Sequence, residues 1–264
     1  MELSQLERYA PQARLDFIQA VTARASKLGI SNNEVLEAKK SGDALIIGGN
    51  VFPASIDHKR KALVDRVEKD GFDKVMEEAA YTWFNRFTAM RYMEIHGYIE
   101  EHPFSLFEST DGSSEPEILK NVTDLNDWKE LNFNLALDLK TQNKTEDLYR
   151  LILTAQCDSL GKIIPFLFSY HAAETELLLP DGLLLSDSII KEMITVLNKE
   201  NLGEVVSLGW LYQFYIAEKK DALMKAKKAY KTDEIPAVTQ LFTPNWIVKY
   251  LTQNSIGRLW LSVY

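Results

Sequence analysis

A lysine-rich stretch near the C-terminus has the composition best suited to binding an anion. Between Glu218 and Lys231 the sequence has six lysines and two acidic residues, whereas the whole chain has 30 Lys plus Arg, 38 Asp plus Glu and a net charge of -8. An acidic protein needs such a local basic surface to contact the phosphates of a nucleic acid. The alternative is a solvated helix face. The residues predicted to contact nucleic acid are Lys219, Lys220, Lys225, Lys227 and Lys228.

The residue types that most often act as nucleophiles or metal ligands lack the spacing that these roles need. The single cysteine, Cys157, lies in the apolar stretch "LTAQCDSLG" and is expected to be a small buried hydrophobic residue. No two histidines lie three or four residues apart, as they do in zinc motifs built on a pair of histidines. The four histidines are His58, His96, His102 and His171. We therefore predict no catalytic residue and no metal site in this chain.

Composition predicts a globular protein of the reducing cytoplasm. Hydrophobic residues make up 46% and charged residues 26% of the 264 residues, which is ordinary for a soluble protein. One cysteine excludes a disulfide within the chain. No apolar run is long enough to span a bilayer, and the charged N-terminus does not read as a signal peptide. We expect no membrane partner.

Hydrophobic spacing predicts a mainly α protein. Leu6, Tyr9, Ala13, Phe17, Ile18 and Val21 recur every three to four residues, as on one face of a helix. Gly29 is a plausible end of that helix, and Ser31 with Glu34 has the spacing of a capping box for a following one. The period is lost around residues 42–56, where a short strand or an irregular turn is expected.

A long helix is predicted from near Lys59, with a break at Gly71. From Phe72 to Gly97 the helix is apolar on nearly all faces, which indicates the central helix of the core. It also carries Arg86 and Arg91 beside aromatic residues. Ion pairs with Glu78 or Glu94 inside a helical bundle are the expected role of these arginines, and stacking on nucleic acid is the alternative.

The rest of the chain reads as a loop followed by more helices. Residues 101–120 are rich in Pro, Gly, Ser and acids, which is typical of an exposed loop or linker. Helical patterns return at 127–138, 147–159 and 188–198. In the segment "FTPNWIVKYLTQNSIG", Thr243 suits a helix N-cap and Pro244 the first helical position, and Gly257 is expected to end the helix after Ile256.

This last segment resembles motif X of the amino-methyltransferases that modify adenine N6 in DNA. Five blocks, in the same order, resemble the N-terminal region of the adenine-specific DNA methyltransferase family of BREX phage defence, PglX. The blocks are "EEAAYTWFNRFTAMRYMEIHGYI", "LYRLILTAQCDSLGKIIPFLF", "LLLPDGLLL", "LGWLYQFYIAEKKD" and "IPAVTQLFTPNWIVKYLTQNSIGRLWL". They cover most of the chain from Glu77 onward. The first seventy or so residues match only loosely.

The resemblance implies an activity, a cofactor and partners. It implies transfer of a methyl group from S-adenosylmethionine to adenine N6 in DNA, to mark self DNA in phage defence, with DNA and other BREX proteins as partners. Phe242, Thr243 and Pro244 would bind the cofactor, since a helix N-terminus suits its carboxylate. It also implies a helical N-terminal domain over residues 1–235 and the start of a methyltransferase domain over 236–264.

The same resemblance predicts that the chain alone is inactive. Such enzymes have an Asp/Asn-Pro-Pro-Tyr/Phe motif for the flipped base and a glycine-containing acidic loop for the cofactor. The sequence has no Pro-Pro dipeptide, and no glycine-rich loop follows Gly257. We therefore expect a truncated or fragmentary methyltransferase. The alternative is a helical protein-interaction module without catalysis, in which the aromatic residues form an interface.

Overall fold

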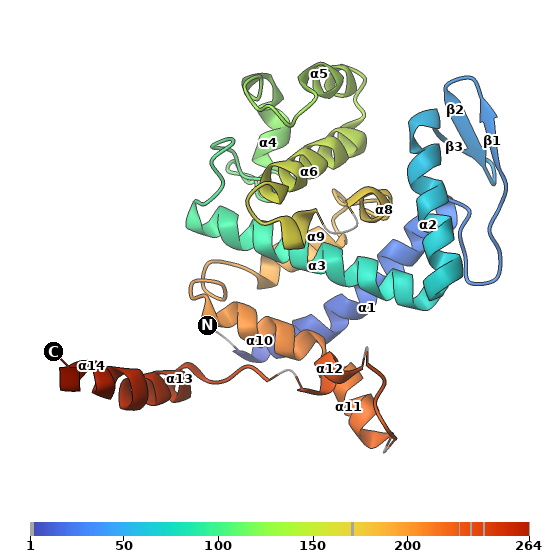
Figure 1. Ribbon diagram of the computed structural model, residues 1–264. Helices are drawn as coiled ribbons and strands as arrows, with labels where there is room; N and C mark the ends of the chain where they lie inside the picture. The colour runs from blue at the N-terminus through green and yellow to red at the C-terminus, as the bar shows by residue number, and fades with distance from the viewer. Residues whose placement is uncertain (1–2, 170–171, 227, 233, 240, 264) are drawn as a thin grey trace. The chain divides into compact units, whose positions relative to one another are not determined.

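The computed structural model describes residues 3–169, 172–226, 228–232, 234–239 and 241–263, and it is mainly helical as predicted (Figure 1). The chain forms two compact units. One unit is residues Gln12–Asn198, and the other combines Met1–Pro11 with Lys199–Tyr264. The units are described separately below. The predicted division at residue 235 stays a prediction.

The first helix has the predicted apolar face. Helix α1 spans Leu3–Lys27, and within the larger unit it buries Ala13, Phe17 and Val21. The chain turns at Gly29, whose φ is +69° and whose position leaves no room for a side chain, because a Cβ there would lie 2.5 Å from Ile47 Cγ2. The predicted end of the helix near Gly29 is thus confirmed: α1 ends at Lys27, and the chain turns at Gly29.

The predicted capping box at Ser31 is wrong. Ser31 Oγ accepts a hydrogen bond from Glu34 N at 3.1 Å, but no helix follows. The pair closes a local turn instead, which is the other structure that a serine hydroxyl stabilises. Strands β1 (Ala38–Ser41), β2 (Ala44–Ile47) and β3 (Asn50–Pro53) come next, in an antiparallel sheet of order β1-β2-β3.

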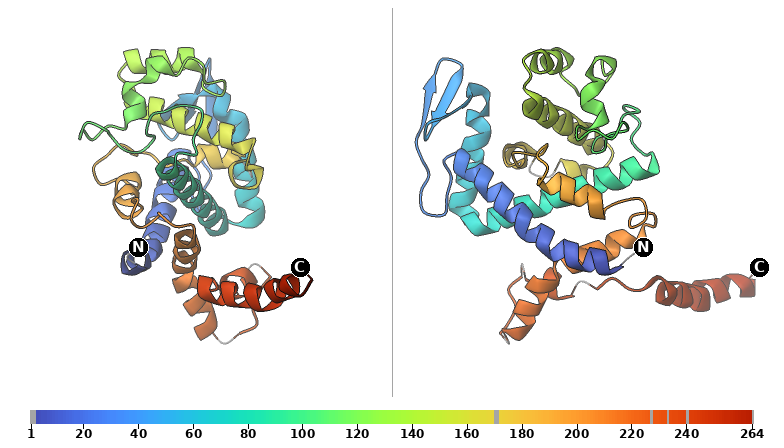
Figure 2. Two further views of the ribbon diagram at one scale, coloured as in Figure 1. Left: turned by 90° about the vertical axis from the view of Figure 1, so that its left-hand side faces the viewer. Right: turned by 180° about the vertical axis from the view of Figure 1, so that it is seen from behind.

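The sheet settles the structure of the segment that the sequence left open. Ile46 pairs with Lys39 on one side and with Val51 on the other. Leu45 and Ile47, which alternate with these exposed positions, are buried. Figures 1 and 2 place this small sheet beside α2, at one end of the larger unit.

Two helices separated by a glycine form the centre of the larger unit. The 3-10 turn η1 (Ala54–Ile56) leads into α2 (Asp57–Asp70), and α3 (Phe72–His96) follows after Gly71, whose φ is +91°. Gly97, with φ +67°, ends α3, and Tyr98 N donates to Met93 O at 2.8 Å. These predicted boundaries are confirmed.

Helix α3 is the central core helix, as its all-round apolar sequence predicted. The ring of Phe84 packs edge-on against Phe17 of α1 at 5.6 Å, and Phe87 packs in the same way against Phe107 at 6.2 Å. The residues of α3 that are buried are Val75, Met76, Ala79, Ala80, Trp83, Phe84, Asn85, Arg86, Phe87, Thr88, Met90 and Arg91.

The segment after α3 is irregular, as predicted, but it is not exposed throughout. Leu106 and Phe107 are fully buried, and the hydroxyl of buried Tyr149 donates to Leu106 O at 2.9 Å. The prediction of an exposed loop is therefore wrong for this part, because two apolar side chains anchor the segment to the core. Short helices α4 (Glu117–Lys120) and η2 (Val122–Asp124) follow it.

The remaining helices of the larger unit begin later or earlier than predicted. The helix expected at 127–138 is α5, Phe133–Thr141, which starts after Asn132 caps the amide of Leu135. The helices expected at 147–159 and 188–198 are confirmed as α6 (Thr145–Gly161) and α9 (Ile189–Val196). Between them lie the short helices α7 (Pro165–Phe168) and α8 (Ala172–Leu177).

In its described part, the smaller unit contains the first residues of α1 and further helices from the C-terminal part of the chain. They are α10 (Val206–Tyr215), α11 (Ala217–Lys225), α12 (Ile235–Thr239), α13 (Asn245–Thr252), a π-helical stretch η3 (Gln253–Gly257) and α14 (Arg258–Val263). Gly257 does not end the last helix, which is a correction. The helix changes to wider turns at η3 and then continues to Val263.

Arginine side chains close the C-terminal ends of several helices in the larger unit. Arg60 Nε donates to Leu28 O at 2.8 Å after α1, and Arg24 Nε donates to Leu177 O at 3.0 Å at the end of α8. Arg91 Nε donates to Leu197 O at 2.9 Å after α9. The last carbonyls of a helix lack partners inside it, so these bonds satisfy groups that would otherwise be buried unpaired.

Asp181 balances the charge of two of the part-buried arginines. Its carboxylate contacts Arg24 at 3.0 Å, Arg150 at 3.3 Å and Lys27 at 2.9 Å. Burial alone raises the pKa of Asp181, but the three cations together hold it below its ordinary value. The carboxylate is therefore charged at neutral pH and joins α1 to α6.

We predict that Asp181→Ala destabilises the protein by about 3 kcal/mol, because Arg24 and Arg150 would keep their charges without a counter-ion. Urea unfolding at pH 7 measures the change. Since the folded pKa is lowered, the contribution of Asp181 is present above its unfolded pKa and fades as the pH falls through the folded value. The exposed pair of Lys61 and Asp57 provides a control, and Lys61→Ala should leave the free energy of unfolding nearly unchanged, because water and salt screen an exposed pair. Equal effects of the two variants would contradict this role of Asp181.

Candidate cofactor and nucleic-acid sites

The Phe-Thr-Pro segment, the predicted cofactor site, is anchored on helix α10 through Phe242. Its backbone N donates to Gln213 Oε1 at 2.8 Å, and its ring meets Trp210 in a T-shaped contact at 5.5 Å. Gly209 makes the close approach possible, because a Cβ at this position would lie 1.9 Å from Phe242 Cε2. A glycine in the middle of α10 thus has a packing reason, which the sequence alone did not reveal.

The helix after this segment begins one residue later than predicted. Helix α13 starts at Asn245, with Pro244 as its N-cap and Ile247 N bonded to Pro244 O at 2.9 Å. Thr243 is exposed and does not cap α13 with its side chain, which corrects the prediction. The first amides of α13 remain without intrahelical acceptors, as at every helix N-terminus, and can donate to an anion. Cofactor binding by Phe242, Thr243 and Pro244 stays a prediction.

The helical segment from α13 to α14 has apolar side chains that its own unit leaves exposed. Trp246 is 71%, Ile256 70% and Leu261 80% exposed. Others with more than half of their surface exposed are Tyr250, Leu251, Leu259, Trp260 and Val263. So many exposed apolar side chains within one helical segment indicate an interaction site.

Within α11, the three predicted nucleic-acid lysines do not share one face. Lys219, Lys220 and Lys225 belong to α11, where residues share a face only at spacings of three or four. Lys225 and Lys228 are exposed, whereas Lys219 and Lys220 are half-buried. Lys227 lies outside the described residues. Their contact with nucleic acid stays a prediction.

The other residues considered from the sequence have structural positions. Cys157 is buried, and burial raises the pKa of its thiol to about 12, so it is the inert buried residue expected. Arg91 pairs with Glu94 at 2.7 Å, as expected, while Glu78 pairs with Arg66 rather than with Arg86. Because Arg86 and Arg91 are 2% and 3% exposed, the alternative of stacking on nucleic acid is wrong.

No metal site is evident in the described part of the chain, where no group of three His, Cys, Asp or Glu side chains could hold an ion. His102 is buried, and its Nε2 lies 3.1 Å from Gln156 Oε1. Burial lowers the pKa of His102, although the bond to Gln156 raises it. His171 lies outside the described residues. No described helix has the length and apolar character to cross a membrane.

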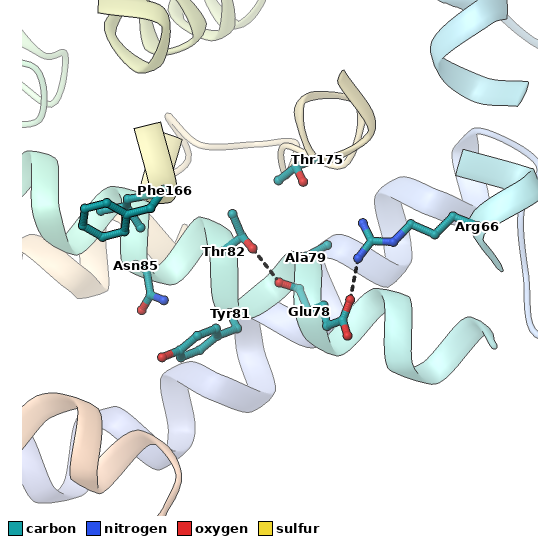
Figure 3. Close-up of a pocket in the computed structure, with 9 residues that line it drawn as sticks. Arg66, Glu78, Ala79, Tyr81, Thr82, Asn85, Phe166 and Thr175 are labelled. Carbon is teal, nitrogen blue, oxygen red and sulfur yellow. Dashed lines mark hydrogen bonds and ion pairs between the residues drawn. The ribbon is translucent and has the colours of Figure 1, made fainter. Parts of the chain in front are cut away.

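A pocket in the larger unit was missed from the sequence. It is lined by α3 together with residues of α2, α7 and α8, as Figure 3 shows. Asn85 is 8% exposed in this helix, and its Oδ1 has no hydrogen-bond partner among the described residues. An asparagine inside an apolar helix was the available signal, but a sequence cannot say whether such an amide is satisfied.

Comparison with known proteins gives the class to which the chain is related. It is 42% identical over 271 residues to the adenine-specific methyltransferase BrxX of Escherichia coli O9:H4 (strain HS). It is 32% identical over 289 residues to the adenine-specific methyltransferase PglX of Lacticaseibacillus casei (strain Zhang). Both alignments cover 100% of this chain, but 22% and 24% of the two relatives. No protein-family profile matches the chain.

Over its whole length, therefore, the chain is similar to a segment of two adenine-specific methyltransferases. The predicted resemblance to the PglX family is confirmed, and it extends to the first seventy residues, for which only a loose match was expected. The chain spans less than a quarter of the length of these two relatives.

We predict that Gly209→Ala displaces Phe242 from α10, because the added Cβ would overlap the ring. Limited proteolysis should then cleave faster between residues 239 and 246. Gly257→Ala is the matched control, since a Cβ there meets Thr252 O only at 3.5 Å. Alanine should stabilise that helix by about 0.5–1 kcal/mol. Unchanged proteolysis of Gly209→Ala would contradict the anchoring of Phe242.

Proposed function

We propose that this chain is the N-terminal segment of an adenine-specific DNA methyltransferase of the PglX family. The observation that carries the proposal is the similarity of the whole chain to two named adenine-specific methyltransferases. In this proposal the complete enzyme transfers a methyl group from S-adenosylmethionine to adenine N6 in DNA and so marks self DNA in phage defence. Its working place is the cytoplasm, and other defence proteins are its partners.

The role proposed for the Phe-Thr-Pro segment is to present a helix end to the cofactor. Phe242 fixes the segment on α10, and the first amides of α13 then supply donors for a carboxylate. A helix N-terminus of this kind can bind one end of a ligand, but it provides no general base and no nucleophile. The catalytic motifs of the enzyme class are not in this sequence, so we propose that the isolated chain transfers no methyl group.

The exposed apolar residues of α13 and α14 support this reading of the chain as one segment of a larger enzyme. A helix with Trp246 and Leu261 this exposed gains stability only when another surface covers it. In the proposal, the catalytic region of the methyltransferase provides this cover. The rival function, a helical interaction module without catalysis, would place a separate protein there.

A chimaera of E. coli BrxX tests the proposal, with this chain replacing the part of BrxX that aligns with it. Deleting that part should abolish N6-methyladenine in cellular DNA, and the chimaera should restore it, measured by mass spectrometry of digested DNA. Phe242→Ala in the chimaera should raise KM for S-adenosylmethionine by about tenfold. A well-expressed chimaera without methylation, or robust methylation by the isolated chain, would refute the proposal.

The lysine-rich segment makes a separate prediction for DNA binding. Replacing the exposed Lys225 and Lys228 by glutamine should reduce the slope of log affinity against log salt by about 0.9 for each lysine that contacts a phosphate. Binding of the chain to a short duplex at several salt concentrations measures the slope. The exposed Lys39 and Lys40 of β1, changed in the same way, control for net charge. An equal loss in the control pair would exclude specific contacts by Lys225 and Lys228.

A further inference from the structure

Three aromatic rings gather at the C-terminal end of α3, at the margin of the larger unit (Figure 1). The ring of His96 stacks on that of Tyr92, with 4.1 Å between the centroids and 25° between the planes. The ring of Tyr98 lies 5.6 Å from that of His96, at an angle of 29°. Gly97, which ends the helix with φ +67°, turns the chain back and so brings Tyr98 onto this stack.

Hydrogen bonds fix the positions of these rings. Tyr98 N donates to Met93 O at 2.8 Å, as is common where a glycine ends a helix. His96 Nδ1 lies 2.8 Å from Tyr92 O, which sets the orientation of the imidazole. A ring whose position is already fixed loses little conformational freedom when a ligand covers it, and this favours binding.

Tyr98 is the exposed member of the stack. It is 57% exposed, whereas Tyr92 and His96 are half-buried. One side of the Tyr98 ring therefore rests against His96, and the rest is open to water. An ordered aromatic ring that is exposed in this way has the properties of the residues that anchor protein interfaces.

The sequence around this ring is strongly acidic. From residue 92 to residue 119 it has seven acidic residues and no lysine or arginine. The acidic residues are Glu94, Glu100, Glu101, Glu108, Asp111, Glu115 and Glu117. Lys120, which follows, pairs with Asp111 at 2.6 Å. This surface therefore attracts a positively charged group and repels the phosphates of a nucleic acid.

An inner arginine compensates part of this charge and leaves Glu100 available. Arg91 pairs with Glu94 at 2.7 Å and with Glu108 at 2.5 Å. Glu100 is exposed, and its carboxylate forms no ion pair within the part of the chain that the structure describes. Because Glu100 follows Tyr98 by two residues, their Cα atoms are at most about 7 Å apart. A carboxylate without a counter-ion thus lies close to the exposed ring.

An arginine side chain matches both groups. Its planar guanidinium stacks on the face of an aromatic ring, and the N–H groups at its edge donate in pairs to a carboxylate. A lysine ammonium is more strongly hydrated and has no flat face, so it gains less from the ring. An apolar side chain would cover Tyr98 but would remove water from Glu100 without replacing it by a partner.

We propose that the end of α3 is a docking site for a partner protein that presents an exposed arginine, whose guanidinium stacks on Tyr98 and donates to Glu100. The proposal concerns an interaction surface of the larger unit alone. It goes beyond methyl transfer and does not depend on it, because its test measures binding.

Titration of the full chain with a peptide in which three arginines alternate with glycines tests the proposal. Peptides of the same length with lysine, or with citrulline as the neutral isostere of arginine, are the matched ligands. At low salt we expect saturable binding of the arginine peptide with a Kd of about 1 mM or tighter. The lysine peptide should bind about threefold more weakly, and the citrulline peptide should show no saturable binding. In NMR spectra, nuclear Overhauser effects should join arginine side-chain protons to the ring of Tyr98.

Variants at the two contact residues locate the site, and both positions are exposed, so the fold should be retained. Tyr98→Ala should weaken binding of the arginine peptide about fivefold, whereas Tyr98→Phe, which keeps the ring, should retain the affinity. Tyr250→Ala, at a tyrosine of similar exposure (61%), should change nothing. Glu100→Gln should weaken binding about threefold. Glu68→Gln, which removes an equal charge from an exposed position of α2, should have a smaller effect.

Absence of saturable binding of the arginine peptide would overturn the proposal. So would equal affinities for the arginine and citrulline peptides, which would indicate an apolar docking surface, or equal affinities for the arginine and lysine peptides, which would indicate attraction by net charge alone. Equal losses in Tyr98→Ala and Tyr250→Ala, or in Glu100→Gln and Glu68→Gln, would place the peptide elsewhere and overturn it as well. The methylation result of the chimaera is independent of all these outcomes.

Discussion

The larger unit depends on arginine side chains that satisfy backbone carbonyl groups at helix ends and in turns. A helix leaves its last four carbonyls without internal partners, and a unit with many short helices has many such groups to satisfy inside its core. Arg24, Arg60, Arg86, Arg91 and Arg150 each donate to at least one backbone carbonyl. The guanidinium group is suited to this because it carries five donors and stays charged when buried. For Arg150, burial and the nearby Arg24 lower the pKa to about 10, which still leaves it protonated at neutral pH.

This constraint explains why the irregular parts of the unit have defined positions. Arg150 donates to Leu179 O and Pro180 O, and so fixes a turn that no regular structure holds. Arg86 fixes α7, which has only four residues and could not persist alone. The exposed ring of Phe166 and the pocket beside it therefore owe their position to a buried arginine in the central helix. Arg86 and the carbonyl of Phe168 that it binds are 82 residues apart in the sequence, so no local pattern predicts this contact.

The sequence was sufficient for the elements whose signals are local. The apolar periodicity of α1 and α3 identified both helices, Gly29 marked the end of α1, and Gly71 and Gly97 marked the two ends of α3. These signals were sufficient because periodicity and positive φ are properties of neighbouring residues. Predictions were wrong where one residue pattern is compatible with two local structures. Ser31 and Glu34 form a turn instead of a helix cap, and Gly257 lies inside a helix instead of ending it. The contacts that form the candidate sites could not be predicted from the sequence for a different reason. The seat of Phe242 on Gly209 and the unsatisfied amide of Asn85 depend on contacts between distant segments, which no local pattern encodes.

The free energy of unfolding of Arg86→Leu tests the central claim most directly. Leucine keeps apolar volume in the core but leaves the carbonyls of Leu167 and Phe168 without their donor. Urea denaturation at neutral pH should show a loss of about 3 kcal/mol relative to the unaltered chain. A loss below about 0.5 kcal/mol, the size of an ordinary surface substitution, would contradict the claim that buried arginines hold the short helices in place.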